Sequence, residues 1–290
     1  MSSIRSGWIN GFIGVAIFSA SLPATRIAVA DFDPIFLTVA RASIAGLLGV
    51  ALLFILRQKY PAKSDIASLL IVAFGVVVGF PLFTALALQH ITSAHSIIFI
   101  ALLPLATAIF GVIRAGDNPH PAFWIFAILG STLVAGFAAI EDLSGSWVGD
   151  AYMLVAIIVC GLGYAEGALL SRKLGGWQVI SWALFISLPI MLPMSLFTLP
   201  STFIDVSPGA WFALGYVSLF SMLIGFVFWY LGLAQGGIAA VGQLQLLQPF
   251  MGLLLSAFLL GEHVSLTMGI VSLAVIFCVI GAKKYTNKRQ

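Results

Sequence analysis

The chain has 290 residues, of which 61% are hydrophobic and 8% are charged, and its formal net charge is +3. This composition lies outside the range of soluble globular proteins, so it excludes a soluble globular fold. Apolar runs of about 20 residues, the length that crosses a bilayer as a helix, recur along the chain, whereas the alternating pattern of an outer-membrane barrel does not. We therefore expect an all-α polytopic membrane protein.

Dividing the apolar runs at charged residues and at Gly, Pro and Asn clusters predicts ten transmembrane helices. Two uncharged stretches, residues 66–113 and 206–261, are each long enough for two crossings, and the sequences QHITSAH and QGG divide them. The first apolar run exceeds a signal peptide in length and has no small-residue cleavage site, so it is interpreted as a retained span. The predicted spans are residues 7–29, 34–56, 66–88, 92–115, 120–140, 150–171, 177–199, 209–233, 238–260 and 264–282.

The distribution of charge predicts that the N- and C-termini are cytoplasmic. In that orientation the inner segments hold 11 of the 13 Lys and Arg residues, and the outer loops hold none. Cytoplasmic segments of membrane proteins carry this excess of positive charge. Because the basic residues are dispersed in short loops, no nucleic-acid partner is expected. The outer loops instead hold acidic residues, namely Asp31, Asp33, Glu141, Asp142, Asp150, Asp205 and Glu262.

The number of spans indicates an inverted repeat, because a duplicated unit of five spans enters the membrane upside down the second time. Residues 85–117 align with 230–262 at an offset of 145, with six identities in 33 positions that include Pro104 with Pro249. A proline in mid-span removes a backbone hydrogen bond and opens the helix. We expect two inverted five-helix repeats, residues 1–143 and 144–290, with helix breaks or hinges at Pro104 and Pro249.

Three glutamines, Gln243, Gln245 and Gln248, lie beside Pro249 in the uncharged stretch. An unsatisfied amide is costly in hydrocarbon, so these side chains should face a neighbouring helix or water. On a regular helix Gln245 and Gln248 lie about 60° apart, while Gln243 lies about 160° from Gln245, so all three share a face only if Pro249 distorts the turn. Two interpretations stay open: hydrogen bonds between helices, or a substrate cavity in which amides bind a zwitterion.

Two charged residues lie inside predicted spans and carry alternative interpretations. Glu166 either reaches toward the cytoplasmic surface or couples transport to protons. Arg41 either pairs with an outer-loop acid or a carbonyl, or binds a substrate carboxylate. The histidines His90 and His95 are either interfacial or cavity residues, and Phe99 shares a helix face with His95.

Several aromatic residues within the spans are either packing and interfacial residues or part of the transport path. A minority of them is expected to line the path. The candidate substrate cavity therefore comprises Phe18, Phe83, His90, His95, Phe99, Tyr164, Trp182, Trp229, Gln243, Gln245 and Gln248.

Features of an intramembrane enzyme are not evident in the sequence. The only adjacent acids, Glu141 and Asp142, fall in a predicted loop, and neither an HExxH nor a P-loop pattern occurs. Cys160 and Cys278 lie in apolar runs, which is typical of buried small residues rather than of a disulfide or a metal pair. We expect no enzymatic activity, no cofactor and no metal site.

Two segments carry a resemblance to a known family: FTALALQHITSAHSIIFIALLPLATAIFG in the first half and WYLGLAQGGIAAVGQLQLLQPFMGLLLSAFLLGE in the second. Each has a helix end rich in aromatic, Ala and Gly residues, a tight break, and then a span centred on proline. With LLGE at residues 259–262 and ARASIAGLLG around Arg41, they make the chain resemble the EamA family of the drug/metabolite transporter superfamily. The resemblance covers nearly the whole chain, as halves of about residues 7–140 and 150–282.

Within that family we compare the chain first with the YddG-type amino-acid exporters. Leu103 precedes Pro104 and Gly163 precedes Tyr164 where those exporters carry tryptophans. This departure argues against selection of aromatic amino acids and leaves open either a broad amino-acid range, aromatic ones included, or a different one.

The resemblance implies a monomeric secondary carrier in the bacterial inner (cytoplasmic) membrane that exports amino acids and related small metabolites by alternating access. Its expected partners are the lipid bilayer and a small-molecule substrate. A drug, quaternary-amine or nucleotide-sugar carrier of the same superfamily is the alternative.

Overall fold

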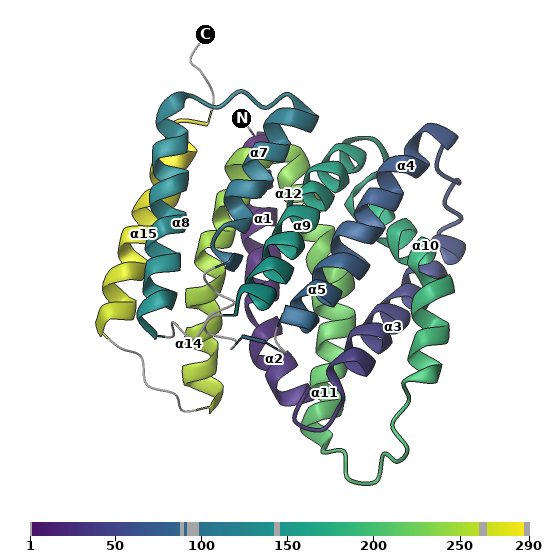
Figure 1. Ribbon diagram of the computed structural model, residues 1–290. Helices are drawn as coiled ribbons and strands as arrows, with labels where there is room; N and C mark the ends of the chain where they lie inside the picture. Colours follow the sequence, from purple (N-terminus) through teal and green to yellow (C-terminus); the bar gives the residue numbers. More distant parts are fainter. Residues whose placement is uncertain (1, 88–89, 92–98, 142–145, 261–265, 287–290) are drawn as a thin grey trace.

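The structure is a computed structural model that describes residues 2–87, 90–91, 99–141, 146–260 and 266–286. Within these residues every regular element is helical (Figure 1). This confirms the prediction of an all-α polytopic membrane protein. Long apolar helices suit a membrane because they satisfy their backbone hydrogen-bonding groups internally.

The first half of the chain forms two long helices and several shorter segments. Its elements are α1 (Ser2–Ser19), α2 (Ser21–Ala28), α3 (Pro34–Ile55), α4 (Lys63–Val72), η1 (Ala73–Gly79), α5 (Phe80–Ala87), α7 (Leu103–Ala115) and α8 (Pro121–Glu141).

The second half begins with a helix of 28 residues and is more broken near its end. Its elements are α9 (Trp147–Leu174), α10 (Gly176–Phe197), α11 (Pro208–Tyr216), η2 (Val217–Ile224), α12 (Gly225–Gly236), α13 (Ile238–Gly242), η3 (Gln243–Leu247), α14 (Gln248–Leu260) and α15 (Leu266–Lys284).

Among the described residues, six continuous helical stretches are long and apolar enough to cross a membrane, and two further apolar helices are shorter. The six are Ile4–Thr25, Pro34–Ile55, Lys63–Thr84, Trp147–Leu174, Gly176–Phe197 and Pro208–Gly236, and the two shorter ones are Leu103–Ala115 and Pro121–Phe137. The count of ten crossings therefore stays a prediction.

Local sequence explains where several helices begin and end. Asp33 caps α3, because its carboxylate accepts hydrogen bonds from the backbone N–H of Ile35 (2.8 Å) and Phe36 (3.1 Å). Gly175 alone separates α9 from α10, and Gly237 alone separates α12 from α13, with φ angles of 99° and 91° that favour glycine. At each of these connections a single glycine changes the direction of the chain between two helices.

The helices pair in a pattern that joins the two halves of the chain (Figure 1). α3 packs along α10 on one side of the bundle and α8 along α15 on the other, while α7 contacts α13 between them. α1 packs along α12, and α9 packs along the continuous segment of α4, η1 and α5. Each of these contacts joins one half of the sequence to the other.

Two segments, η1 and η2, are π-helical, so each backbone hydrogen bond in them spans one residue more than in an α-helix. They span Ala73–Gly79 and Val217–Ile224, so their ends are separated by 144 and 145 residues, close to the offset that relates Pro104 to Pro249. Irregular turns of this type are frequent at functional sites.

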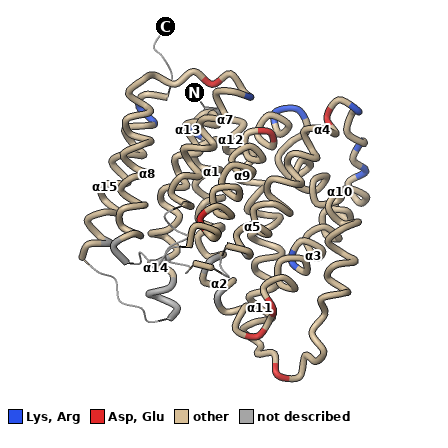
Figure 2. The backbone as a smooth tube through the Cα atoms, in the orientation of Figure 1, with Lys and Arg blue, Asp and Glu red and all other residues tan. Residues whose placement is uncertain are grey.

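Charged residues gather at opposite ends of the bundle (Figure 2). We call the end at which α1 begins and α15 ends the basic end, and the opposite end the acidic end. At the acidic end, Asp31 and Asp33 lie between α2 and α3, Asp150 lies in the first turn of α9, and Asp205 lies between α10 and α11. At the basic end lie Arg5 in α1, Arg57 and Lys59 between α3 and α4, Lys63 at the start of α4, and Arg114, Arg172, Lys173, Lys283 and Lys284 in the last turns of α7, α9 and α15. Asp65 in the first turn of α4 and Asp117 after α7 also lie at the basic end.

Candidate functional site

The backbone is irregular immediately before each of the paired prolines. Pro104 lies in the first turn of α7, and the N–H of Leu102 donates to the carbonyl of Phe99 (2.8 Å), a tighter turn than an α-helix makes. Before Pro249 the chain forms the 3₁₀ turn η3. Proline supplies no N–H and its ring collides with the carbonyl four residues back, which accounts for both disturbances.

The glutamines Gln243 and Gln245 lie on η3, with exposed fractions of 0% and 4%. The 3₁₀ turn reduces their angular separation from about 160° to about 120°, which lets both side chains stay inside the bundle. Gln248 begins α14 and is half-buried. The distorted turn therefore buries two of the three amides.

The two buried amides are mostly unpaired. Gln243 Nε2 donates to the carbonyl oxygen of Pro104 (3.4 Å), which links the two proline breaks across the halves of the chain. Gln243 Oε1 and both amide atoms of Gln245 have no hydrogen-bond partner. Because an unpaired polar atom is costly away from water, these three atoms are available for a ligand or for water.

Aromatic rings form one cluster next to the glutamines. The ring of Tyr164 on α9 lies 5.5 Å from Trp229 and 6.1 Å from Phe226, both on α12. Phe18 on α1 lies 5.1 Å from Phe226, and Phe226 lies 5.4 Å from Tyr230. We call these five residues the aromatic cluster.

Polar atoms accompany the aromatic cluster. The side chains of Cys160 and Gln245 lie near the Tyr164 hydroxyl, although neither amide atom of Gln245 reaches it with hydrogen-bond geometry. The indole N–H of Trp229 is buried without a partner. The cluster therefore joins apolar ring faces to the unpaired donors and acceptors of the glutamines.

Sequence reasoning from single positions does not select Phe226, and it includes Tyr230 only among the aromatic residues that either pack or line the path, not in the candidate cavity. Phe226 precedes Trp229 by three residues and Tyr230 by four, a spacing that places ring side chains on neighbouring parts of one helix face. That spacing is the sequence signal for Phe226. The contact of α12 with α9 is visible only in the structure, where the Tyr230 hydroxyl donates to the carbonyl of Gly163 (3.5 Å).

Glycines allow the helices around the cluster to approach closely. A Cβ atom on Gly232 of α12 would lie 2.5 Å from the backbone nitrogen of Gly11 on α1. A Cβ atom on Gly75 of η1 would lie 3.0 Å from the Cα of Gly163 on α9. Small residues at such interfaces bring backbones together in membranes. The aromatic cluster thus lies where these two closely packed pairs of segments meet.

Ion pairs join the helices nearer the basic end. Glu166 on α9 is 2% exposed and pairs with Arg114 on α7. Lys173 at the end of α9 donates to both carboxylate oxygens of Asp65 on α4, at 2.7 and 2.8 Å. Within the described residues no group of three or more His, Cys, Asp or Glu side chains could share a metal ion.

Other predicted site residues lie elsewhere. Phe83 and the exposed His90 both stack on Tyr152, at 6.4 and 6.2 Å. Trp182 contacts Tyr60 (5.5 Å) in the segment between α3 and α4. Phe99 is half-buried and packs beside Ile91 and Met153, and His95 lies outside the described residues.

Arg41 lies on α3 rather than on the helices of the aromatic cluster. Its Nε atom is buried and has no hydrogen-bond partner. No carboxylate in the described part of the chain forms an ion pair with it.

Comparisons with known proteins show one consistent similarity. The EamA-like transporter family matches residues 5–137 and again residues 147–282. The uncharacterized transporter YdeK of Bacillus subtilis (strain 168) is 66% identical over 287 residues, which cover 99% of this chain and 100% of that protein. An uncharacterized transporter of Archaeoglobus fulgidus is 24% identical, covering 85% of this chain and 86% of its own. A solved crystal structure with 18% identity has a TM-score of 0.81 and covers 97% of this chain and 98% of its own, which shows the same fold.

Proposed function

Because the chain belongs to the EamA-like transporter family and is a membrane transporter, we propose that it is a secondary carrier that exports amino acids and related small metabolites. The observation that carries this proposal is the set of three unpaired amide atoms on Gln243 and Gln245, buried beside the aromatic cluster. Amides supply donors for a carboxylate and acceptors for an ammonium group, so they suit a zwitterion. The ring faces suit apolar side chains of different shapes, which supports broad specificity.

The transport cycle in this proposal is alternating access by ten spans in two inverted repeats, residues 1–143 and 144–290. The paired proline breaks and the paired π-helical segments support the repeat. The pairing of helices supports it too. α1, the first helix of the first half, contacts α12 of the second half, and α9, the first helix of the second half, contacts the corresponding α4 to α5 segment of the first half. Such repeats rock against each other around a central site.

In this proposal the basic end faces the cytoplasm and the protein lies in the cytoplasmic membrane, acting as a monomer. The gathering of Lys and Arg at that end supports this orientation. The ion pairs of Arg114 with Glu166 and of Lys173 with Asp65 then hold that side closed, and they must separate when the site opens to the cytoplasm.

A carrier of quaternary amines or other cationic drugs is the second candidate, and the aromatic cluster favours it. Ring faces attract a quaternary ammonium group. The centres of neighbouring rings among Phe18, Tyr164, Phe226 and Trp229 lie 5.1 to 6.3 Å apart. A nucleotide-sugar carrier has no comparable support from this site.

Transport into proteoliposomes tests the proposal. Labelled amino acids, a quaternary amine and a nucleotide sugar are offered separately, with and without a pH gradient. We expect amino-acid flux in the wild type, a large loss in Gln245→Leu, and retained flux in Leu246→Met, a volume-conserving change in the same turn. Flux of the quaternary amine or the nucleotide sugar alone, or normal amino-acid flux in Gln245→Leu, would contradict the proposal.

The pH gradient arm tests whether Glu166 carries protons. Because Arg114 compensates its charge in this structure, we expect Glu166→Gln to alter the rate of amino-acid flux without abolishing it. Loss of gradient-driven flux with normal exchange at equal pH would instead make Glu166 the coupling residue.

A further inference from the structure

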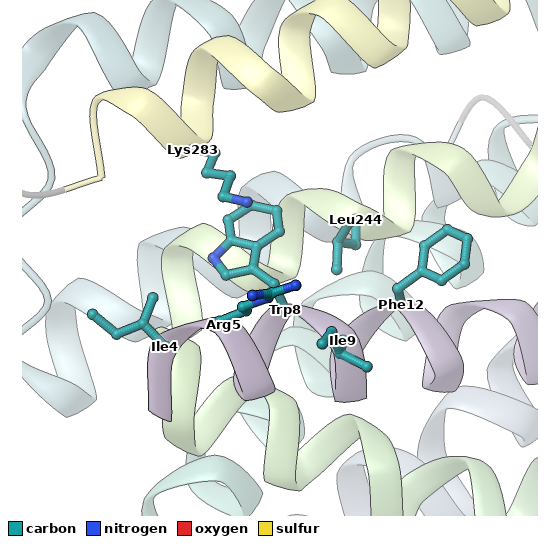
Figure 3. A pocket seen from close by; sticks show the side chains of 7 residues that line it. All are labelled: Ile4, Arg5, Trp8, Ile9, Phe12, Leu244 and Lys283. Carbon is teal, nitrogen blue, oxygen red and sulfur yellow. The ribbon is translucent and has the colours of Figure 1, made fainter. Parts of the chain in front are cut away.

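A groove at the basic end lies between α1, η3 and the end of α15, and its volume is about 620 Å³. Arg5, Trp8 and Lys283 line one part of it (Figure 3). Ile4, Ile9, Phe12 and Leu244 line the rest. The groove is therefore basic at one place and apolar elsewhere.

Among the described residues, Arg5 and Lys283 have no acidic partner. Lys283 Nζ lies 4.5 Å from the centre of the Trp8 ring, a cation–π contact that leaves its N–H groups able to donate to an anion. The Arg5 side chain also lies beside Trp8, whose ring stands between Arg5 and Lys283 in Figure 3. No described carboxylate pairs with either cation.

Three of the four apolar side chains of the groove are open to the surroundings, whereas Leu244 is buried at its floor, 5% exposed. Ile4 and Ile9 are each 52% exposed and Phe12 is 47% exposed. A soluble anion would satisfy Arg5 and Lys283 but would leave these side chains uncovered. An amphipathic anion covers both parts, and basic pockets between helices at the cytoplasmic side of membranes bind acidic lipid head groups.

We propose that this groove binds one anionic phospholipid, with its phosphate beside Trp8, held by Arg5 and Lys283, and an acyl chain along Ile9, Phe12 and Leu244. Leu244 lies between Gln243 and Gln245 in η3. The acyl chain therefore contacts the outer side of the turn that carries the buried amides. Binding of the lipid stabilises that turn, whichever solute the protein carries.

Lipid binding can be measured on the purified full-length chain in nanodiscs. Discs of phosphatidylcholine alone are compared with discs that also contain phosphatidylglycerol, by thermal unfolding and by native mass spectrometry. We expect phosphatidylglycerol to raise the unfolding temperature and one molecule to stay bound per chain. Arg5→Gln and Lys283→Gln should each weaken its affinity by about fivefold, which corresponds to about 1 kcal/mol per cation.

Matched variants separate this site from general attraction of basic residues. Lys284→Gln removes the neighbouring charge, which lies over Tyr285 (5.6 Å) and does not line the groove, so it should retain the bound lipid. Arg5→Lys and Lys283→Arg keep the charge and should bind like the wild type. If these two variants fold and bind the lipid, the positions tolerate substitution, and weaker binding in the Gln variants reports the loss of charge rather than a loss of folding.

Three results would overturn the proposal. Equal loss of lipid in Lys284→Gln would indicate non-specific surface attraction. Equal stabilisation by inorganic phosphate in phosphatidylcholine discs would indicate a soluble-anion site. A dimer that persists without bound phosphatidylglycerol and dissociates in Arg5→Gln would make the groove a contact between two copies of the chain.

Discussion

The buried amide of Gln245 illustrates how a single residue can oppose stability and serve a site. Both of its polar atoms lack partners, and the residue is 4% exposed. Removing an unsatisfied buried polar group relieves a cost of about 1–3 kcal/mol. An apolar side chain of similar size at this position should therefore stabilise the protein.

We predict that Gln245→Leu raises the thermal unfolding temperature in detergent although it lowers transport. Gln243→Leu should raise it less, because that change also removes the hydrogen bond to the Pro104 carbonyl. A lower unfolding temperature in Gln245→Leu would assign the amide to helix packing instead.

Asp31 is a second residue whose surroundings lead to a measurable effect. Ser207 donates to Asp31 Oδ2 from its hydroxyl (2.6 Å) and from its backbone N–H (2.9 Å). These hydrogen bonds, the hydroxyl first, hold the pKa of Asp31 below its ordinary value. A carboxylate with a lowered pKa in the folded state stabilises the protein above its unfolded pKa of about 3.9, and this stabilisation is lost as the pH falls through the folded pKa.

We predict that Asp31→Asn unfolds at a lower temperature than the wild type at about pH 6, because a charge-assisted bond is stronger than a neutral one. The difference should shrink as the pH is lowered below about 3.9, because the wild-type carboxylate gains a proton as the pH falls through its lowered pKa. Thermal unfolding of both proteins over a series of pH values from about 6 downward checks this. A Ser207→Ala background should abolish most of the difference, whereas a gap that does not change with pH would exclude the carboxylate as its cause.

The helix pair α1 and α12 shows how small residues determine packing at the level of elements. A Cβ on Gly232 would approach the Gly11 nitrogen to 2.5 Å, whereas a Cβ on Gly215 would meet no atom within 4 Å. Both glycines lie in the helical stretch Pro208–Gly236. They therefore differ mainly in the space around them.

We predict that Gly232→Ala lowers the stability by about 1–3 kcal/mol through overpacking. Gly215→Ala should leave it unchanged or raise it by about 0.5–1 kcal/mol, because alanine favours a helix. Thermal or denaturant unfolding of the two variants side by side provides the measurement. Equal effects would mean that the close approach of α1 and α12 is not required for stability.

At the scale of the whole molecule, two closely packed pairs meet at the aromatic cluster: α1 with α12, and α9 with the α4 to α5 segment. In the proposed transport cycle, rocking of one pair against the other would change the contacts of Tyr164, Trp229 and Tyr230 first. The basic and acidic ends would then correspond to the two sides of the membrane.

This orientation predicts which positions a membrane-impermeant thiol reagent reaches. Ile204 at the acidic end is 90% exposed and Tyr60 at the basic end is 80% exposed, whereas the native Cys160 and Cys278 are buried. We expect Ile204→Cys to be labelled in intact cells and Tyr60→Cys only after the membrane is made permeable. The reverse pattern would place the termini outside, and labelling of both in intact cells would contradict the predicted number of crossings.

The sequence by itself determined the class of the protein and its family. Hydropathy and helix length act locally, so an all-helical membrane protein could be predicted without any contact, and the resemblance to the EamA family is confirmed. Pro104 and Pro249 also act locally, on the turn that precedes each of them. Their role as hinges stays a prediction.

Only the tertiary structure decided which side chains meet. It brings Tyr164 to Phe226 and Arg114 to Glu166, places Trp182 beside Tyr60, and forms a groove from Arg5 and Lys283, which are 278 positions apart. The physical reason is that lipid and protein interior are equally apolar, so hydrophobic periodicity does not reveal which face of a membrane helix is buried. The rotation and partner of each helix follow instead from close packing at glycines and from paired polar groups.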